Sequence, residues 1–155
     1  MRALVQRVTR ARVTVRDQAG NPVEVAAIGP GLVVLVGVTH GDDEETARRL
    51  ADKVWNLRVF DDATGAMNVS VAEAGGALCV VSQFTLYGST ARGRRPSWAE
   101  AARPDHAEPL VAGFVAALVD RGGSVATGRF GAMMEVELVN DGPVTLMVEV
   151  LSTAG

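Results

Sequence analysis

The chain has 155 residues, of which 48% are hydrophobic and 21% charged, and its formal net charge is −3. This length predicts a single domain over residues 1–155, and the composition excludes an intrinsically disordered chain. The negative net charge argues against a generally basic surface that binds nucleic acid. No apolar run reaches the length of a signal-peptide core or a membrane span, so we expect a cytoplasmic protein without a membrane partner.

The basic residues are unevenly spread. Five arginines precede the first acidic residue, Asp17, and a second cluster consists of Arg92, Arg94 and Arg95. Such patches permit a polyanionic partner without requiring one.

Residues 2–16 alternate well enough to predict one or two strands, with the apolar side chains at odd positions. Arg7 is the exception on that apolar face. A guanidinium buried there without acceptors would cost roughly 3 kcal/mol or more, so it must be paired. The alternative is a bulge that shifts the register and frees Arg7 to solvent.

The middle of the chain alternates between strands and one helix. Residues 32–38 form a continuous apolar run typical of a central strand, and the helical spacing of residues 43–57 predicts an amphipathic helix, with Asp42 and Glu45 as its capping pair. Cys79, the single cysteine, lies in an apolar run, which predicts a buried side chain and excludes a disulfide within the chain. Further strands are predicted at residues 23–28, 58–60, 67–71 and 77–81.

The second half begins with a glycine- and arginine-rich loop at residues 88–97. A helix follows over residues 106–121 and ends at Gly122 and Gly123. Strands are predicted at residues 125–130, 134–139 and 144–151, and the extreme end of the chain, residues 151–155, is expected to fray.

Asp141-Gly142-Pro143 separates the last two alternating runs, so it predicts a hairpin tip. Proline is unusual there because it cannot donate to a strand ladder, and an X-Pro bond is the only kind with a realistic chance of being cis. Either the segment is an ordinary turn, or its fixed backbone presents carbonyl and amide groups at a site.

Most conventional catalytic sites are missing from the sequence. The two histidines lack ligand spacing, and there is no serine elbow, Rossmann loop or Walker loop, so we expect neither a metal nor a cofactor. What remains is a set of small polar groups, Ser82, Gln83 and Thr85, at the end of a buried strand. Such groups and their backbone amides are good oxyanion donors and poor general bases, although they also serve simply to cap a strand end.

The quoted motifs resemble those of the D-aminoacyl-tRNA deacylase family. The similarity rests on Ser-Gln-Phe-Thr-Leu at residues 82–86 together with Asn-Asp-Gly-Pro-Val-Thr at residues 140–145. It extends over nearly the whole chain, through residues 1–8, 29–32, 67–68, 92–97 and 127–131.

The resemblance implies an esterase that acts on the aminoacyl-tRNA 3′ end, with no DNA partner. Its substrates would be D-aminoacyl-tRNA and glycyl-tRNA mischarged on tRNA-Ala. It implies a homodimer in which a cis Gly142-Pro143 bond, anchored by Arg7, reaches into the partner's pocket and excludes L-amino acids. Ser82, Gln83, Phe84 and Thr85 would form the catalytic turn, with the substrate's own 2′-hydroxyl helping to activate water. Phe130, Gly131 and Met134 would receive the adenosine.

One position departs from the family pattern. Met133 stands where many family members carry an acidic residue, which changes the polarity expected at the rim of the adenosine pocket.

We therefore predict an α+β fold: a strongly curved, partly barrel-like, mainly antiparallel sheet with two principal helices packed on one side. Two alternative functions stay open at this point. One is a non-catalytic tRNA-end-binding module, favoured by the arginine clusters, and the other is a small-ester hydrolase with Thr85 as nucleophile.

Overall fold

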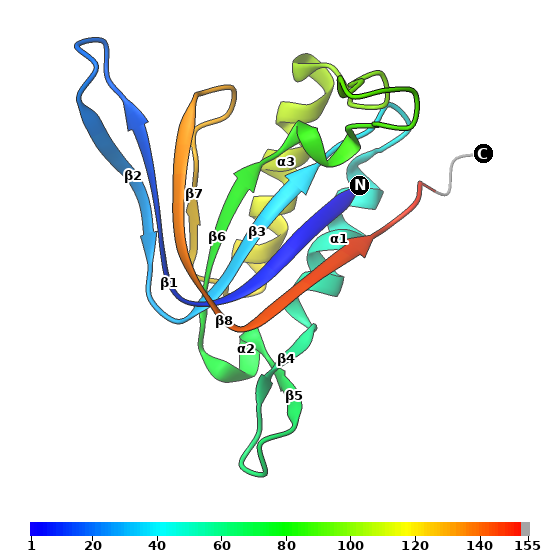
Figure 1. Cartoon of the computed structure of the whole chain (residues 1–155). Helices are drawn as coiled ribbons and strands as arrows, with labels where there is room; N and C mark the ends of the chain where they lie inside the picture. The colour runs from blue at the N-terminus through cyan, green and yellow to red at the C-terminus, as the bar shows by residue number, and fades with distance from the viewer. Residues whose placement is uncertain (153–155) are drawn as a thin grey trace.

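Two long antiparallel strands form the centre of the fold. β1 (Arg2–Arg16) pairs with β8 (Met134–Glu149) over nearly its whole length. The other edge of β1 is shared by β3 (Gly31–Gly37), which pairs with its first half, and β2 (Pro22–Ile28), which pairs with its second half. The computed structural model describes residues 1–152, and Figure 1 shows how these strands curve around one another.

The sheet continues beyond β3 with two parallel strands. β6 (Ala77–Ser82) pairs with β3, and β7 (Val125–Thr127) pairs with β6. The predicted curved, mainly antiparallel sheet is confirmed, with a parallel part that arises because chain crossovers carrying helices connect these strands. The remaining elements are α1 (Glu44–Trp55), β4 (Arg58–Asp61), β5 (Met67–Ser70), α2 (Val71–Ala74), the 3₁₀ turn η1 (Phe84–Tyr87) and α3 (Pro104–Asp120).

The two long helices cover one face of the sheet (Figure 1). They bury the side chains of β1 and β3 that point toward them, together with Leu50 of α1 and Phe114 of α3, which are fully buried. Burial of each such side chain is worth about 1.5–3 kcal/mol. A second cluster fills the inside of the sheet's curve and includes Val13, Val33 and the predicted buried Cys79.

Both predicted helices are present. α1 begins one residue later than expected because its N-cap is Asp43, whose carboxylate accepts a hydrogen bond from the Thr46 amide at 2.8 Å. The predicted Asp42 cap is wrong: Asp42 is buried instead, 2.6 Å from the amino nitrogen of Met1. α3 ends as predicted, with a left-handed Gly122.

Two strand predictions near the end of the chain are wrong. β7 stops at Thr127 and not at residue 130, and the chain then turns through Gly131, whose φ is +72°. The strands predicted at residues 134–139 and 144–151 are one strand, since β8 pairs with β1 on both sides of the Asp-Gly-Pro segment. That segment is therefore not a hairpin tip. It is a bulge in β8, in which residues 141–144 stand opposite Arg7 alone.

Residues 153–155, part of the tail expected to fray, lie outside the described residues. Within residues 1–152, no helix is both long and apolar enough to cross a membrane.

Candidate functional site

The predicted catalytic turn lies where β6 leaves the sheet. The Gln83 amide still donates to the Val36 carbonyl at 2.7 Å, and the chain then turns into η1. The Gly88 amide closes this turn by donating to the Thr85 carbonyl at 2.9 Å. Because the first N–H groups of a helical turn have no partner within it, the amides of Phe84 and Thr85 are available as donors.

A cavity of about 570 Å³ opens beside this turn. One wall consists of Ser82, Gln83 and Phe84. The opposite wall comes from the loop between β7 and β8, and includes Phe130, Gly131 and Met134. The structure thus brings together two groups of predicted residues that are far apart in sequence. It does so because β3, β6 and β7 run parallel, so their carboxyl ends meet at one edge of the sheet.

Among the described residues that line the cavity, none carries a charged side chain. Besides the residues named above, the lining consists of Val36, Val38, Val81, Trp98, Ala101, Ala102, Pro104, Ala107, Ala132, Met133 and Val136. Polar groups come from Ser82, Gln83 and the backbone. Such a cavity suits a flat, uncharged ring with a polar group at one end.

Trp98 is a cavity residue that the sequence analysis missed. Its ring meets Phe84 edge-to-face with 5.3 Å between ring centroids, and it lines the cavity. A Cβ on Gly88 would stand 2.4 Å from the Trp98 ring, so the glycine permits this position. A tryptophan in a loop of small and charged residues was the available signal, because large aromatic rings in such loops commonly serve binding.

Thr85 lies next to the cavity lining, and its hydroxyl accepts a hydrogen bond from the Gln83 side-chain amide. The histidines contact backbone carbonyls: His40 Nε2 is 2.9 Å from the Ala99 oxygen, and His106 Nε2 is 2.9 Å from the Asp42 oxygen. No general base is therefore seen beside Thr85 in the described contacts. Within residues 1–152, no group of three His, Cys, Asp or Glu side chains gathers in a way that could hold a metal.

Arg2 connects the predicted catalytic turn to the central strands. Its guanidinium donates to the Leu86 carbonyl at 3.2 Å and to Glu149 at 2.7 Å, and it lies 4.4 Å from the centre of the Tyr87 ring. Tyr87 is 5% exposed, and this burial raises the pKa of its phenol well above the ordinary value, with a smaller contribution from the charge of Asp42. Tyr87 therefore acts as a neutral, apolar support beneath the turn.

The predicted selectivity residues form a separate cluster around Arg7. This side chain is 8% exposed and donates to the carbonyls of Val59 at 2.6 Å and Asp141 at 3.3 Å. It also pairs with the carboxylates of Asp61 at 3.3 Å and Asp141 at 3.4 Å. The prediction that a buried Arg7 must be paired is confirmed, and the alternative of a solvent-exposed Arg7 is wrong.

The expected cis bond before Pro143 is not found, since none of the described peptide bonds is cis. The trans form of an X-Pro bond is favoured by about 0.5–1 kcal/mol, and the chain turns instead through Gly142 with a φ of +107°. Arg7, Gly142 and Pro143 do not line the cavity, so within one chain the two predicted groups stay apart.

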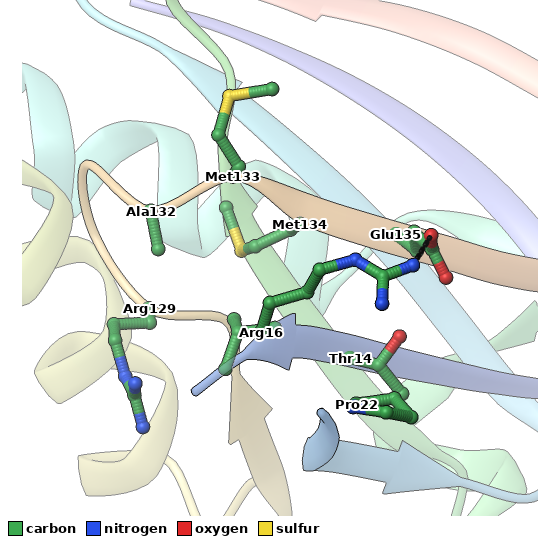
Figure 2. Close-up of a pocket in the computed structure, with 9 residues that line it drawn as sticks. Thr14, Arg16, Pro22, Arg129, Ala132, Met133, Met134 and Glu135 are labelled. Atoms are coloured by element: carbon green, nitrogen blue, oxygen red, sulfur yellow. Dashed lines mark hydrogen bonds and ion pairs between the residues drawn. The ribbon is translucent and has the colours of Figure 1, made fainter. Parts of the chain in front are cut away.

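A second cavity, of about 440 Å³, adjoins the first and shares Ala132, Met133 and Met134 with it (Figure 2). Arg16 lies across it and pairs with Glu135 at 3.3 Å. Met133 is 92% exposed and stands at the rim between the two cavities, which makes this rim apolar where family members were expected to carry an acid.

Comparisons with known proteins agree on one family. The family model described as D-Tyr-tRNA(Tyr) deacylase matches residues 4–149. Proteins named D-aminoacyl-tRNA deacylase from Heliobacterium modesticaldum and Nocardia farcinica are each 58% identical over 149 residues, covering 96% of this chain and 96% and 99% of theirs.

Two solved structures share the fold. One, titled c-Myc DNA Unwinding Element Binding Protein, has a TM-score of 0.88 at 37% identity and covers 98% of this chain and 100% of its own. The other, titled a probable eukaryotic D-amino acid tRNA deacylase, has a TM-score of 0.79 at 18% identity and covers 96% of this chain and 98% of its own.

Proposed function

The chain belongs to the D-Tyr-tRNA(Tyr) deacylase family, and we propose that it hydrolyses the ester joining a D-amino acid to the terminal adenosine of tRNA. It is a carboxylic ester hydrolase. The observation that carries this conclusion is the uncharged cavity that unites the catalytic turn with the predicted adenosine wall.

We propose that the adenine ring lies between Phe130, Gly131 and Met134, and that the ester lies against Ser82, Gln83 and Phe84. The amides of Phe84 and Thr85 then stabilise the oxyanion that forms when water attacks the ester carbon. Donors placed in this way contribute roughly 3 kcal/mol to transition-state stabilisation. Water supplies the hydroxyl of the released acid, and its proton goes to the ribose oxygen that leaves. The substrate's 2′-hydroxyl helps to activate this water, because the lining contains no acid or base.

Incubation of the purified protein with D-Tyr-tRNA and L-Tyr-tRNA tests the activity. We expect rapid release of D-tyrosine and slow release of L-tyrosine. Equal rates, or no cleavage of the D-ester, would exclude a chiral proofreading esterase. Binding of uncharged tRNA without any turnover would favour a tRNA-end-binding module instead.

The role of Thr85 separates the proposed mechanism from a threonine nucleophile. We expect Thr85→Ala to keep a rate near that of the wild type, since the hydroxyl only accepts a bond from Gln83. Loss of activity in this variant, with a normal rate for Thr90→Ala in the neighbouring exposed loop, would favour the nucleophile.

We further propose that two copies associate so that the bulge of one chain reaches the cavity of the other. The supporting observations are that β8 pairs only with β1 within residues 1–152, and that it leaves the apolar side chains of Val139, Leu146 and Met147 exposed, at 36%, 42% and 52%. A long apolar edge strand of this kind is normally covered. In this arrangement, the backbone at Gly142 and Pro143 rejects an L side chain, whereas glycyl-tRNA mischarged on tRNA-Ala is accepted because glycine has no side chain to reject.

Leu146→Glu tests the association. We expect this variant to sediment as a monomer and to lose discrimination between D- and L-esters, whereas Leu151→Glu, at a 72% exposed position beyond β8, should leave both unchanged. A Leu146→Glu variant that is monomeric yet fully selective would remove the partner from the selectivity mechanism.

The proposed partner is the aminoacyl-tRNA 3′ end, and the proposed location is the cytoplasm. The absence of a DNA partner stays a prediction. Because one structural neighbour is titled a DNA-element-binding protein, binding assays need a DNA control of the same length.

A further inference from the structure

Most arginines of this chain are paired, and the exceptions gather near the cavity. Among residues 1–152, five arginines have no hydrogen bond or ion pair: Arg10, Arg92, Arg94, Arg95 and Arg129. Four of these five belong to segments that directly adjoin the cavity lining. Their charge is not offset by sequence neighbours either, because no acidic residue occurs between Glu73 and Glu100 or between Asp120 and Glu135.

Three of the four lie in one loop, residues 89–97, which we call the arginine loop. Its ends are tied by reciprocal backbone hydrogen bonds of 2.9 and 2.8 Å between Ser89 and Ser97. The next residue is Trp98, which lines the cavity and packs on Phe84. The arginine loop is therefore continuous with the cavity wall, and its three arginines are exposed to solvent.

The fourth arginine directly precedes the opposite wall of the cavity and lines the second cavity. Arg129 precedes Phe130 in the loop between β7 and β8, which lies at the same end of the sheet as the arginine loop (Figure 1). Figure 2 shows its side chain extending away from the other residues drawn, whereas Arg16 is held toward Glu135. Among residues 1–152, Arg129 is thus an arginine without a hydrogen bond or ion pair on this side of the cavity.

The negative net charge of the whole protein means that a polyanion can be attracted only by a local positive surface. A chain with a formal charge of −3 repels a polyanion, and the cavity lining offers no charge that could attract one. Attraction must therefore come from a local positive surface, and the unpaired arginines in the segments that adjoin the cavity lining provide it.

We propose that Arg92, Arg94, Arg95 and Arg129 bind the backbone phosphates of the RNA strand whose terminal nucleotide enters the cavity. This inference rests on the proposed function and adds to it the surface by which the protein holds the tRNA acceptor end. Arginine suits this role because its planar guanidinium donates two hydrogen bonds to one phosphate. The contacts position the strand and carry no base information.

Two substrates distinguish an effect on phosphate binding by the arginine loop from an effect on the catalytic site. D-Tyr-tRNA carries the phosphates, whereas 3′-O-D-tyrosyl-adenosine carries none. We expect the R92Q/R94Q/R95Q variant to hydrolyse the adenosine ester at the wild-type rate and to lose kcat/KM on D-Tyr-tRNA. Each lost phosphate contact lowers the slope of log Kd against log salt by about 0.7–0.9. Between 50 and 200 mM salt, the affinity of the wild type for uncharged tRNA should therefore fall roughly 20–40-fold more than that of the triple variant.

Arg10→Gln is the matched control, because Arg10 is also unpaired but lies on β1 away from the cavity. It should leave the salt slope unchanged, whereas Arg129→Gln should lower it by about 0.7–0.9. A triple lysine variant should keep the wild-type slope, since the charge is retained.

Equal losses of the triple variant on both substrates, an unchanged salt slope, or a lysine variant that behaves like the glutamine variant would each overturn the proposal. Failure of the wild type to cleave either D-ester would instead refute the proposed function. Thermal unfolding of each variant at the wild-type temperature confirms that the comparison concerns folded protein.

Discussion

Replacement of Gly142 by alanine tests whether the bulge of β8 is held in place by Arg7. Gly142 has a φ of +107°, and an added Cβ would stand 2.8 Å from Arg7 Nη2 and 3.0 Å from Val144 Cγ2. The substitution therefore imposes backbone strain and also displaces a guanidinium that is engaged in four polar contacts.

The expected loss of stability follows from a comparison with Gly122, a second glycine with a positive φ. Gly122 has a φ of +92° and open space around its Cβ position, so Gly122→Ala reports the strain alone, about 1–3 kcal/mol. Loss of one hydrogen bond to a charged group costs a further 1.5–3 kcal/mol, roughly. We therefore expect the free energy of unfolding of Gly142→Ala to lie below that of Gly122→Ala by this further amount. The corresponding difference in Tm between the two variants is about 3–12 °C.

Urea unfolding of both variants at one protein concentration measures the stability difference, and hydrolysis of D- and L-Tyr-tRNA measures its functional consequence. We expect the ratio of kcat/KM for the two esters to fall at least about tenfold in Gly142→Ala, or 1.4 kcal/mol, and to stay unchanged in Gly122→Ala. Equal destabilisation of the two variants, with unchanged selectivity, would refute the reasoning that Arg7 positions the bulge.

Three further predictions concern the rest of the site. The carboxylate of Asp42 lies 2.6 Å from the buried amino group of Met1, so Asp42→Asn leaves this amino group without its counterion. We expect urea unfolding to show a decrease of about 3–5 kcal/mol in the free energy of unfolding. A decrease below about 1 kcal/mol would contradict a buried ion pair. Tyr87 is the single tyrosine, and its raised pKa predicts that native phenol absorbance titrates above pH 10 but near 10 in denaturant. Since the proton is held more tightly in the folded state, this contribution to stability is complete below pH 10 and is lost as the pH rises toward the folded value; equal midpoints would contradict the prediction. Gly88→Ala should push Trp98 off Phe84, changing tryptophan fluorescence and raising KM for D-Tyr-tRNA, and a wild-type KM would exclude Trp98 from substrate binding.

The paired state of Arg7 was predictable from sequence because it follows from a single physical requirement. The apolar residues at most odd positions of residues 2–16 place this guanidinium on a buried face, and burial without acceptors is too costly to tolerate. The identity of the acceptors was not predictable. The carbonyl of Val59 and the carboxylate of Asp61 come from β4, a short strand outside the main sheet, and nothing local in the sequence places it beside β1.

The candidate site also contains residues that the sequence predicted and one that it did not. Polar residues at the end of a buried strand and the family resemblance predicted the catalytic turn and the adenosine wall, and both line one cavity. Trp98 was missed because it sits in an irregular loop, where periodicity gives no orientation. Its position depends on the missing side chain of Gly88, a packing relation that only three-dimensional structure reveals.

The bulge in β8 shows why the sequence pattern was ambiguous and why the outcome matters. Two alternating runs joined by Asp-Gly-Pro fit a hairpin and a bulged strand equally well, because both leave the same residues apolar on each side. Pairing with β1 decides between them: Asn140 lies opposite Val8 and Thr145 opposite Gln6, so both ends of the segment are fixed to one strand. A hairpin tip would be free to move relative to the sheet, whereas a bulge tied at both ends and held by Arg7 keeps its backbone groups in place. The proposed rejection of an L side chain by backbone atoms requires such a fixed position, since a mobile segment would yield to the side chain.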